Sequence, residues 1–125
     1  MGKYEVTVLP DDKQLAQSAA EQWLNCLAGA ERGKPFIVAL SGGRIARTFF
    51  SSVAKLGKNK RNLFETVHFF WADERCVPPV DPESNYRIAE ELMFTPLNIA
   101  QDNVHRIPGE EPPQAAVVRA EKKTY

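Results

Sequence analysis

The stretch that decides the fold is residues 67–75, which read Val-His-Phe-Phe-Trp-Ala-Asp-Glu-Arg. An almost continuous apolar run comes first, and three charged residues follow it directly. Apolar runs without polar alternation are typical of parallel strands that are covered on both faces. In open parallel sheets, ligands bind beyond the carboxyl ends of the strands. The stretch therefore predicts a buried strand over 67–72 that delivers charged side chains to a ligand-binding edge.

The segments on either side of this strand alternate between strand and helix patterns. Further strands are expected at 4–9 and 36–40, with a short one at 104–107. Helices are expected to begin at Asp11, just after Gly43 and at Ser84, where Asp11 and Ser84 are predicted N-caps, and a last helix is expected over 112–123. Their inward-facing residues recur at helical spacing: Ala16, Ala19, Ala20, Trp23, Leu24 and Leu27; Ile45, Phe49, Val53 and Leu56; Ile88, Leu92 and Met93. The alternation predicts an α/β fold with a mainly parallel sheet and helices on both faces.

Composition restricts the classes of function. The chain has 125 residues, of which 43% are hydrophobic, and its 16 basic and 16 acidic residues balance to a net charge of zero. This is ordinary for a globular domain, and it gives no basic excess that would call for nucleic acid. The sequence shows no signal peptide or membrane-spanning stretch, so we expect a cytoplasmic protein. Cys26 and Cys76 lie far apart in the sequence and lack Cys or His neighbours at metal-ligand spacing. A disulfide between them is possible, but we expect reduced thiols.

The first candidate site is Ser41-Gly42-Gly43-Arg44, between the strand at 36–40 and the helix that follows. Two glycines let backbone N–H groups approach a ligand, and a helix N-terminus favours anions. Arg44 adds a forked donor suited to phosphate. The alternative is a tight turn that only needs glycine conformations, and the residues alone do not separate the two interpretations.

The second candidate site is Asp73-Glu74-Arg75, at the end of the most apolar strand. Arg75 could clamp an oxyanion, while a carboxylate could take a proton or orient a sugar hydroxyl. A local salt bridge that caps the strand is the alternative. We favour a functional role because the strand delivers the triplet to the ligand edge. His68 within the strand and His105 in the segment 104–107 are more simply structural, although His105 could face a ligand cleft.

Five motifs in order resemble the 6-phosphogluconolactonase family, within the superfamily that also holds glucosamine-6-phosphate isomerases. They are Ala-Leu-Ser-Gly-Gly at 39–43, Phe-Trp-Ala-Asp-Glu-Arg at 70–75, Val-Pro at 77–78, Ser-Asn at 84–85 and Val-His-Arg-Ile-Pro-Gly-Glu at 104–110. The resemblance implies a Rossmann-like fold and a hydrolase that acts on 6-phosphogluconolactone in the oxidative pentose phosphate pathway of carbohydrate metabolism. It implies no metal and no cofactor.

The resemblance also assigns site residues. It implies that Ser41, Gly42, Gly43 and Arg75 hold the phosphorylated lactone, with Asp73 near the reacting end, and Arg44 is expected to add to the anion site. Further candidates for substrate contact are Glu74, Asn85, His105 and Arg106. Many family members follow Ser-Gly-Gly with Ser/Thr-Thr-Pro, whereas this chain has Arg-Ile-Ala at 44–46, which is expected to mark a subgroup.

The resemblance covers only the first half of such a domain. The family's catalytic His lies in a Gly-Asp-Gly-His-type stretch that has no match here, so residues 1–125 are expected to be the N-terminal part of a single α/β domain. We expect the chain alone to bind phosphorylated sugars weakly without hydrolysing lactone, unless His68 or His105 replaces the base. An unfinished sheet edge would favour self-association. The alternatives are a glucosamine-6-phosphate isomerase/deaminase and a non-catalytic sugar-phosphate-binding module.

Overall fold

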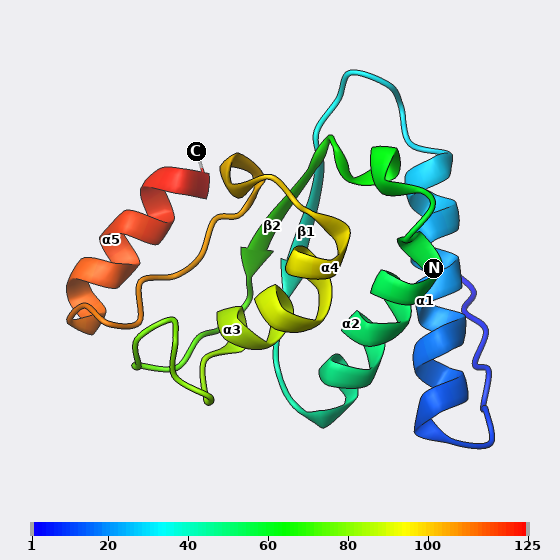
Figure 1. The fold of residues 1–125 in the computed structure, drawn as a ribbon, viewed down its shortest axis with the longest axis horizontal. Coiled ribbons are helices and arrows are strands. Elements are labelled where there is room, and N and C mark those ends of the chain that lie inside the picture. Colours follow the sequence, from blue (N-terminus) through cyan, green and yellow to red (C-terminus); the bar gives the residue numbers. More distant parts are fainter. Residues whose placement is uncertain (1, 125) are drawn as a thin grey trace.

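A computed structural model describes residues 2–124 and shows a mixed α/β arrangement (Figure 1). Its helices and strands, in chain order, are α1 (Asp12–Ala28), β1 (Phe36–Leu40), α2 (Arg44–Gly57), β2 (Val67–Trp71), α3 (Asn85–Ala89), α4 (Thr95–Leu97) and α5 (Pro113–Thr124). Short 3-10 turns lie at Arg61–Phe64 and Gln101–Asn103. The predicted α/β class and the parallel pairing of its two apolar strands are confirmed.

The sheet pairs β1 and β2 in parallel, from Phe36 opposite Val67 to Leu40 opposite Trp71. The strand predicted at 104–107 is wrong in extent, because Val104 makes only an isolated parallel bridge to Phe69. The backbone N–H of His105 donates to the carbonyl of Phe69 at 2.8 Å. Residues 105–107 form no further ladder, and Pro108, which lacks an N–H group, leads into a turn at 109–110.

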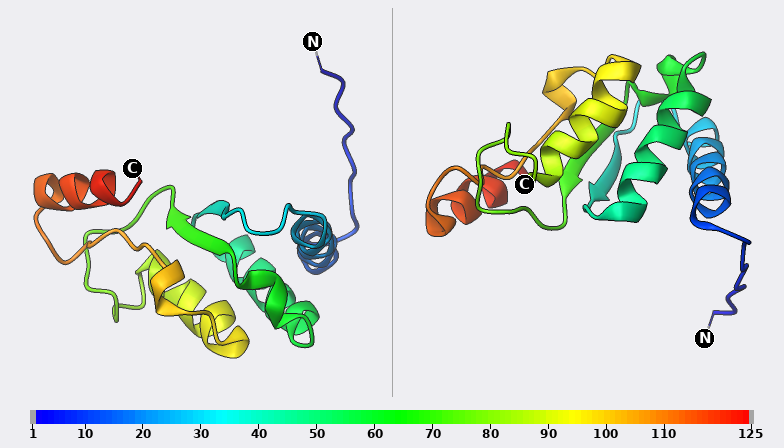
Figure 2. Two further views of the ribbon diagram at one scale, coloured as in Figure 1. Left: turned by 90° about the horizontal axis from the view of Figure 1, so that it is seen from above. Right: turned by 60° about the horizontal axis from the view of Figure 1, so that its bottom comes forward.

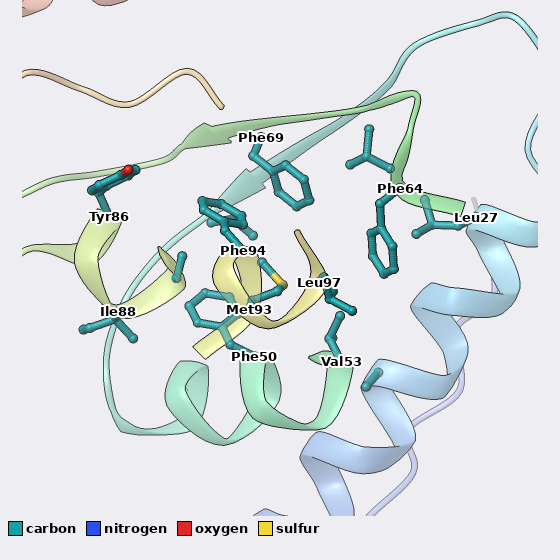
Figure 3. Packing of buried hydrophobic residues seen from close by; sticks show 14 of the residues in the cluster. Leu27, Phe50, Val53, Phe64, Phe69, Tyr86, Ile88, Met93, Phe94 and Leu97 are labelled. Carbon is teal, nitrogen blue, oxygen red and sulfur yellow. The ribbon is translucent and has the colours of Figure 1, made fainter. Parts of the chain in front are cut away.

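The core lies between one face of the sheet and the helices. Phe69 points from β2 toward Phe50 of α2 and toward Met93 and Leu97 of the segment that joins α3 to α4 (Figure 3). Leu27 of α1 closes the cluster beside Phe64 (Figure 3). Burying a large apolar side chain of this kind stabilises the fold by about 1.5–3 kcal/mol. Packing of the helices on this face therefore fixes the position of both strands.

The opposite face of the sheet is largely open. Successive strand residues point to opposite faces, so Ile37 and Ala39 lie away from the core, and Ile37 is 67% exposed. Figure 2 shows α2 and the α3–α4 segment on one side of the strands and α5 on the other. Ile37 stays uncovered although α5 lies on this side of the strands. The apolar run at 36–40 is typical of a strand covered on both faces, and Ile37 departs from that pattern.

The strand predicted at 4–9 is also wrong. The segment is irregular, leads away from the body of the molecule (Figure 2) and leaves Tyr4 and Val8 86% and 87% exposed. A strand needs a neighbour for its backbone groups, and no described segment pairs with this one. The alternating apolar pattern is a property of the segment alone, whereas strand pairing depends on a partner elsewhere in the chain.

The helix predictions hold, with three corrections. The first is that Ala19, predicted to be inward, is exposed on α1. The Asp11 carboxylate accepts from the N–H of Gln14 at 2.8 Å, and the Ser84 hydroxyl accepts from the N–H of Arg87, as expected of N-caps. In α2 the buried face is centred on Phe50 and Val53, and Ile45, predicted to be inward, is exposed. The helix expected to begin at Ser84 forms but includes a π turn at Glu90–Phe94, and Asn98, in the left-handed conformation, ends it after Leu97.

Candidate functional site

The two candidate loops lie side by side at the carboxyl ends of β1 and β2. The strands end in register at Leu40 and Trp71, and the N–H of Ala72 donates to the carbonyl of Leu40 at 2.7 Å. Ser41 and Asp73 therefore leave the same edge of the sheet. This is the edge at which open parallel sheets bind their ligands.

The first loop, residues 41–43, turns directly into α2. Gly43 is the N-cap residue and has a φ of 102°, a conformation that favours glycine, and no side chain caps the helix. Ser41 and Gly43 are exposed. The first N–H groups of α2 thus face solvent with the positive end of the helix dipole, which suits an anion.

Arg44 is turned away from the second loop. Its guanidinium lies 3.4 Å from the Asp12 carboxylate of α1, and its side chain is 90% exposed. A surface ion pair of this kind adds little stability, so the side chain can leave it at small cost. The contribution of Arg44 to anion binding stays a prediction.

The second loop presents Asp73 and Arg75 to solvent. Both residues are exposed, and within the described part of the chain neither side chain takes part in an ion pair. The local salt bridge considered as an alternative for this triplet is therefore absent from this arrangement. An unengaged guanidinium at the ligand edge can form bidentate bonds to a phosphate or carboxylate.

Glu74 differs from its two neighbours because its carboxylate turns inward onto the start of α3. It accepts the N–H groups of Arg75 at 2.8 Å, Asn85 at 2.7 Å and Tyr86 at 3.0 Å, and the hydroxyl of Ser84 at 3.0 Å. The carboxylate thus satisfies helix N–H groups that have no partner within the helix. It is occupied by the fold and is poorly placed to contact substrate.

Asn85 connects the two loops. Its side-chain N–H donates to the carbonyl of Asp73 at 3.2 Å, and the residue is only 2% exposed. A Cβ atom added to Gly42 would lie 2.0 Å from the Asn85 Oδ1. Gly42 is therefore required by space, because the Asn85 amide occupies the position that any side chain there would take.

The two histidines lie away from the strand ends. Nδ1 of His68 and Nε2 of His105 share a hydrogen bond at 2.9 Å, and the His105 ring stacks on Phe70 with centroids 4.6 Å apart. His68 precedes the end of β2 by three residues, about 10 Å at the rise of a strand. The described geometry therefore places neither ring beside Asp73 as a substitute base.

Arg106 holds the segment 104–110 against α3. Its guanidinium makes two bonds to Glu110, at 2.8 and 2.9 Å, and lies over the Tyr86 ring, 5.9 Å from its centroid. The hydrogen bonds from Arg106 lower the pKa of Glu110, and the same bonds raise the pKa of Arg106. Arg106 is thus engaged within the protein and not directed at the ligand edge.

Tyr86 is the most perturbed acid of the region. Burial, the hydrogen bond to Glu90 and the charge of Glu90 raise its pKa to about 12. The phenol therefore stays protonated at physiological pH and acts as a donor to Glu90.

Gly109 packs against the second loop. The sequence analysis did not identify it as a positioning residue. A Cβ atom there would lie 2.2 Å from the Arg75 carbonyl oxygen and 2.8 Å from that of Val77. The segment 104–110 therefore packs backbone to backbone against the loop that carries Arg75. The Pro-Gly pair at 108–109 was a signal for a turn, but nothing local indicates what the turn contacts.

Other site types find no support in the described part of the chain. No group of three or more His, Cys, Asp or Glu side chains is arranged there to hold a metal ion. Both cysteines are free thiols. None of the helices of residues 2–124 combines the length and the apolar character needed to cross a membrane.

Comparison with known proteins identifies the family. Residues 10–124 match the family model described as glucosamine-6-phosphate isomerases/6-phosphogluconolactonase. A 6-phosphogluconolactonase of Haemophilus influenzae is 38% identical over 89 residues, which are 71% of this chain and 38% of the relative. One from Nostoc is 32% identical over 108 residues, covering 85% of this chain and 43% of the relative.

Solved structures agree. The crystal structure of devB protein superposes with a TM-score of 0.81 at 35% identity, and covers 94% of this chain and 48% of that one. A monomeric glucosamine-6-phosphate deaminase shares the fold, with a TM-score of 0.79 at 18% identity, over 97% of this chain and 50% of that one. The chain belongs to the glucosamine-6-phosphate isomerase/6-phosphogluconolactonase family, and it spans about half the length of the relatives it matches.

Proposed function

We propose that this chain supplies the sugar-phosphate-binding half of a site that hydrolyses 6-phosphogluconolactone to 6-phosphogluconate. One observation carries the proposal: the Ser41–Gly43 turn and the exposed Arg75 lie at adjacent strand ends. Backbone N–H groups and a guanidinium on either side of one edge form a cradle for a dianionic phosphate. The relatives named 6-phosphogluconolactonase agree with this chemistry.

Hydrolysis of the lactone needs more than the cradle. The reaction requires a base to activate water and donors for the developing oxyanion. Asp73, exposed beside Arg75, is placed to orient the reacting end of the sugar. His68 and His105 are bonded to each other away from this edge. We infer that the base comes from a part of the enzyme outside these residues, and that this chain alone binds ligand without turnover.

Two other functions remain as alternatives. A glucosamine-6-phosphate isomerase/deaminase is favoured only by the shared fold of the deaminase structure, whereas the Haemophilus influenzae and Nostoc relatives carry the lactonase name. A non-catalytic sugar-phosphate-binding module is favoured by the position of the histidines. Ligand binding would be common to all three functions, and turnover would separate them.

The first experiment titrates the 125-residue chain with 6-phosphogluconate, the stable product, by calorimetry or NMR. Arg75→Ala is expected to weaken binding at least tenfold, because it removes a bidentate charged contact worth about 1.5–3 kcal/mol. Arg32→Ala removes the guanidinium of another exposed residue, in the α1–β1 loop, and is the matched control. Equal affinities of the two variants would contradict the proposed cradle.

The second experiment measures lactone hydrolysis against the spontaneous rate. The isolated chain is expected to add nothing, and a chain of the full length of its relatives is expected to be active on the lactone but not on glucosamine 6-phosphate. Robust activity of the 125-residue chain, lost on His105→Ala, would overturn the assignment of the base. Turnover of glucosamine 6-phosphate by the longer chain would favour the isomerase/deaminase function.

Location and assembly are also proposals. We propose a cytoplasmic protein, supported by the two free thiols and by the lactonase relatives. We further propose that the chain on its own self-associates through the uncovered face and edge of the sheet, where Ile37 is exposed. No role in binding nucleic acid is expected from the balanced charge, and none in membranes from the lack of a long apolar stretch in the sequence.

A further inference from the structure

The middle residue of the charged triplet is the most heavily bonded of the three. Glu74 accepts four hydrogen bonds, three from backbone N–H groups and one from the Ser84 hydroxyl. Such bonds to a carboxylate are charge-assisted and stronger than those between neutral groups. Ser84 is fully buried, and the bonds that Ser84, Asn85 and Tyr86 donate are partly buried. They attach the second loop rigidly to the start of α3.

The same helix start reaches the first loop through the next side chain. Asn85 donates to the carbonyl of Asp73 on one side, and its Oδ1 occupies the space over Gly42 on the other. Glu74 holds the backbone N–H of Asn85 at 2.7 Å, so the carboxylate sets the position from which the amide extends. The contacts form one chain that runs from the second loop through α3 to the first loop.

We propose that Glu74 and Asn85 are positioning residues that set the spacing between the Ser41–Gly43 turn and Arg75. This deepens the proposed function and rests on it: the two loops are the two sides of the phosphate cradle. Displacement of bound groups by about 1 Å can cost about a hundredfold in rate, so a cradle of two loops needs such a link.

The sign of the charge effect makes the proposal testable. Glu74 is an anion next to a site for an anion. By Coulomb's law alone, removing its charge would strengthen the binding of a phosphorylated sugar. Positioning predicts the reverse, because Glu74→Gln loses the bonds that hold the loop. The two explanations therefore differ in direction and not only in size.

The first test needs no ligand. Backbone amide NMR shifts of Glu74→Gln are compared with those of Glu91→Gln, which removes an equal charge from the helical segment that follows α3, at a carboxylate that pairs with Arg87. Glu74→Gln is expected to shift the amides of Gly42 and Gly43, which Glu74 does not touch. Shifts confined to Arg75 and residues 84–86 would overturn the proposal. A dispersed spectrum verifies that the variant is folded.

The second test is binding of 6-phosphogluconate to the same chain. Glu74→Gln and Asn85→Ala are each expected to weaken binding by about tenfold or more, and Glu91→Gln to leave it unchanged. Unchanged or tighter binding by Glu74→Gln would overturn the proposal. Should that variant fail to fold, Asn85→Ala, which changes no charge, decides in the same way.

Failure of the proposed function would look different. The wild-type chain would then show no binding of 6-phosphogluconate at any concentration, while the shifts of Gly42 and Gly43 would still report whether the loops are linked. Absent shifts with intact wild-type binding would instead reject the positioning role and leave the proposed function standing.

Discussion

At the scale of the residue, the site depends on places where no side chain fits. Gly109 has the carbonyl oxygens of Arg75 and Val77 where its Cβ would be, and Gly42 has the Asn85 amide. In the first case the obstacle is backbone, which cannot rotate aside as a flexible side chain can. The loop that carries Arg75 can therefore take this position only because Gly109 has no side chain.

We expect Gly109→Ala to destabilise the chain by about 1–3 kcal/mol, the usual cost of overpacking, and to weaken sugar-phosphate binding because Arg75 is displaced. Gly29→Ala is the matched control, since its nearest obstacle is the Asn25 carbonyl oxygen at 3.6 Å, an ordinary contact. Urea unfolding of both variants measures the difference. Equal unfolding midpoints of the two variants would contradict this prediction, because they would show that the loop that carries Arg75 moves aside at no cost.

Tyr86 provides a prediction about pH. Its pKa is raised from 10.0 to about 12, so the folded state keeps a proton that the unfolded state loses first. The stability that this gives is fully present below pH 10 and is lost as pH rises toward 12. Absorbance titration at alkaline pH should show one tyrosine that ionises at a higher pH than the others. This step should be absent in Tyr86→Phe and retained in Tyr4→Phe. The loss of the late step in Tyr4→Phe would contradict the assignment.

At the scale of the element, local signals predicted most of the helices and failed where contacts are distant. Asp11 and Ser84 were identified as caps because a cap is decided within a few residues, and the bonds to Gln14 and Arg87 are present. The strand at 4–9 failed because pairing depends on a partner elsewhere. The π turn at Glu90–Phe94 has no sequence signal that we recognised.

The candidate site divides in the same way. Its location followed from the strand ends, and Ser41, Asp73 and Arg75 are exposed there as expected. The inward turn of Glu74, the packing of Asn85 over Gly42 and the pairing of Arg44 with Asp12 could not be predicted, because each depends on the angle between elements. Charge and spacing identify a site, but they do not say which carboxylate of a triplet faces inward.

The two caps should differ in energetic weight. Asp11 is exposed, so Asp11→Ala is expected to cost about 1 kcal/mol. Ser84 is buried, caps α3 and also donates to Glu74, so Ser84→Ala is expected to cost about 2 kcal/mol or more because it removes two hydrogen bonds at a buried position. Thermal or urea unfolding compares them, and a larger loss at Asp11 would contradict the central role of the Glu74 cluster.

At the scale of the whole molecule, the main feature is the uncovered face of the sheet. A parallel sheet is ordinarily covered on both faces, yet Ile37 and Ala39 are exposed, and only α5 lies on their side of the strands (Figure 2). The relatives are about twice as long as this chain, and the family fold is therefore represented here by about half its residues.

We expect sedimentation of the 125-residue chain to show concentration-dependent association that Ile37→Lys reduces, because a charge on an exposed strand opposes pairing between copies. Val80→Lys places the same charge at a residue that is also exposed, in the loop before α3, and serves as control. A monomer at all concentrations, or equal effects of both changes, would contradict self-association through the sheet.

The bonds to Glu74 also have a consequence in time. Helices ordinarily fray from their ends, where the first amides lack partners and exchange their hydrogens fastest. In α3 the amides of Asn85 and Tyr86 are held by a carboxylate from the preceding loop. We expect these two amides to exchange slowly, so that α3 does not fray first at its N-terminus. The segment where the two candidate loops meet would then be among the last parts of the molecule to open.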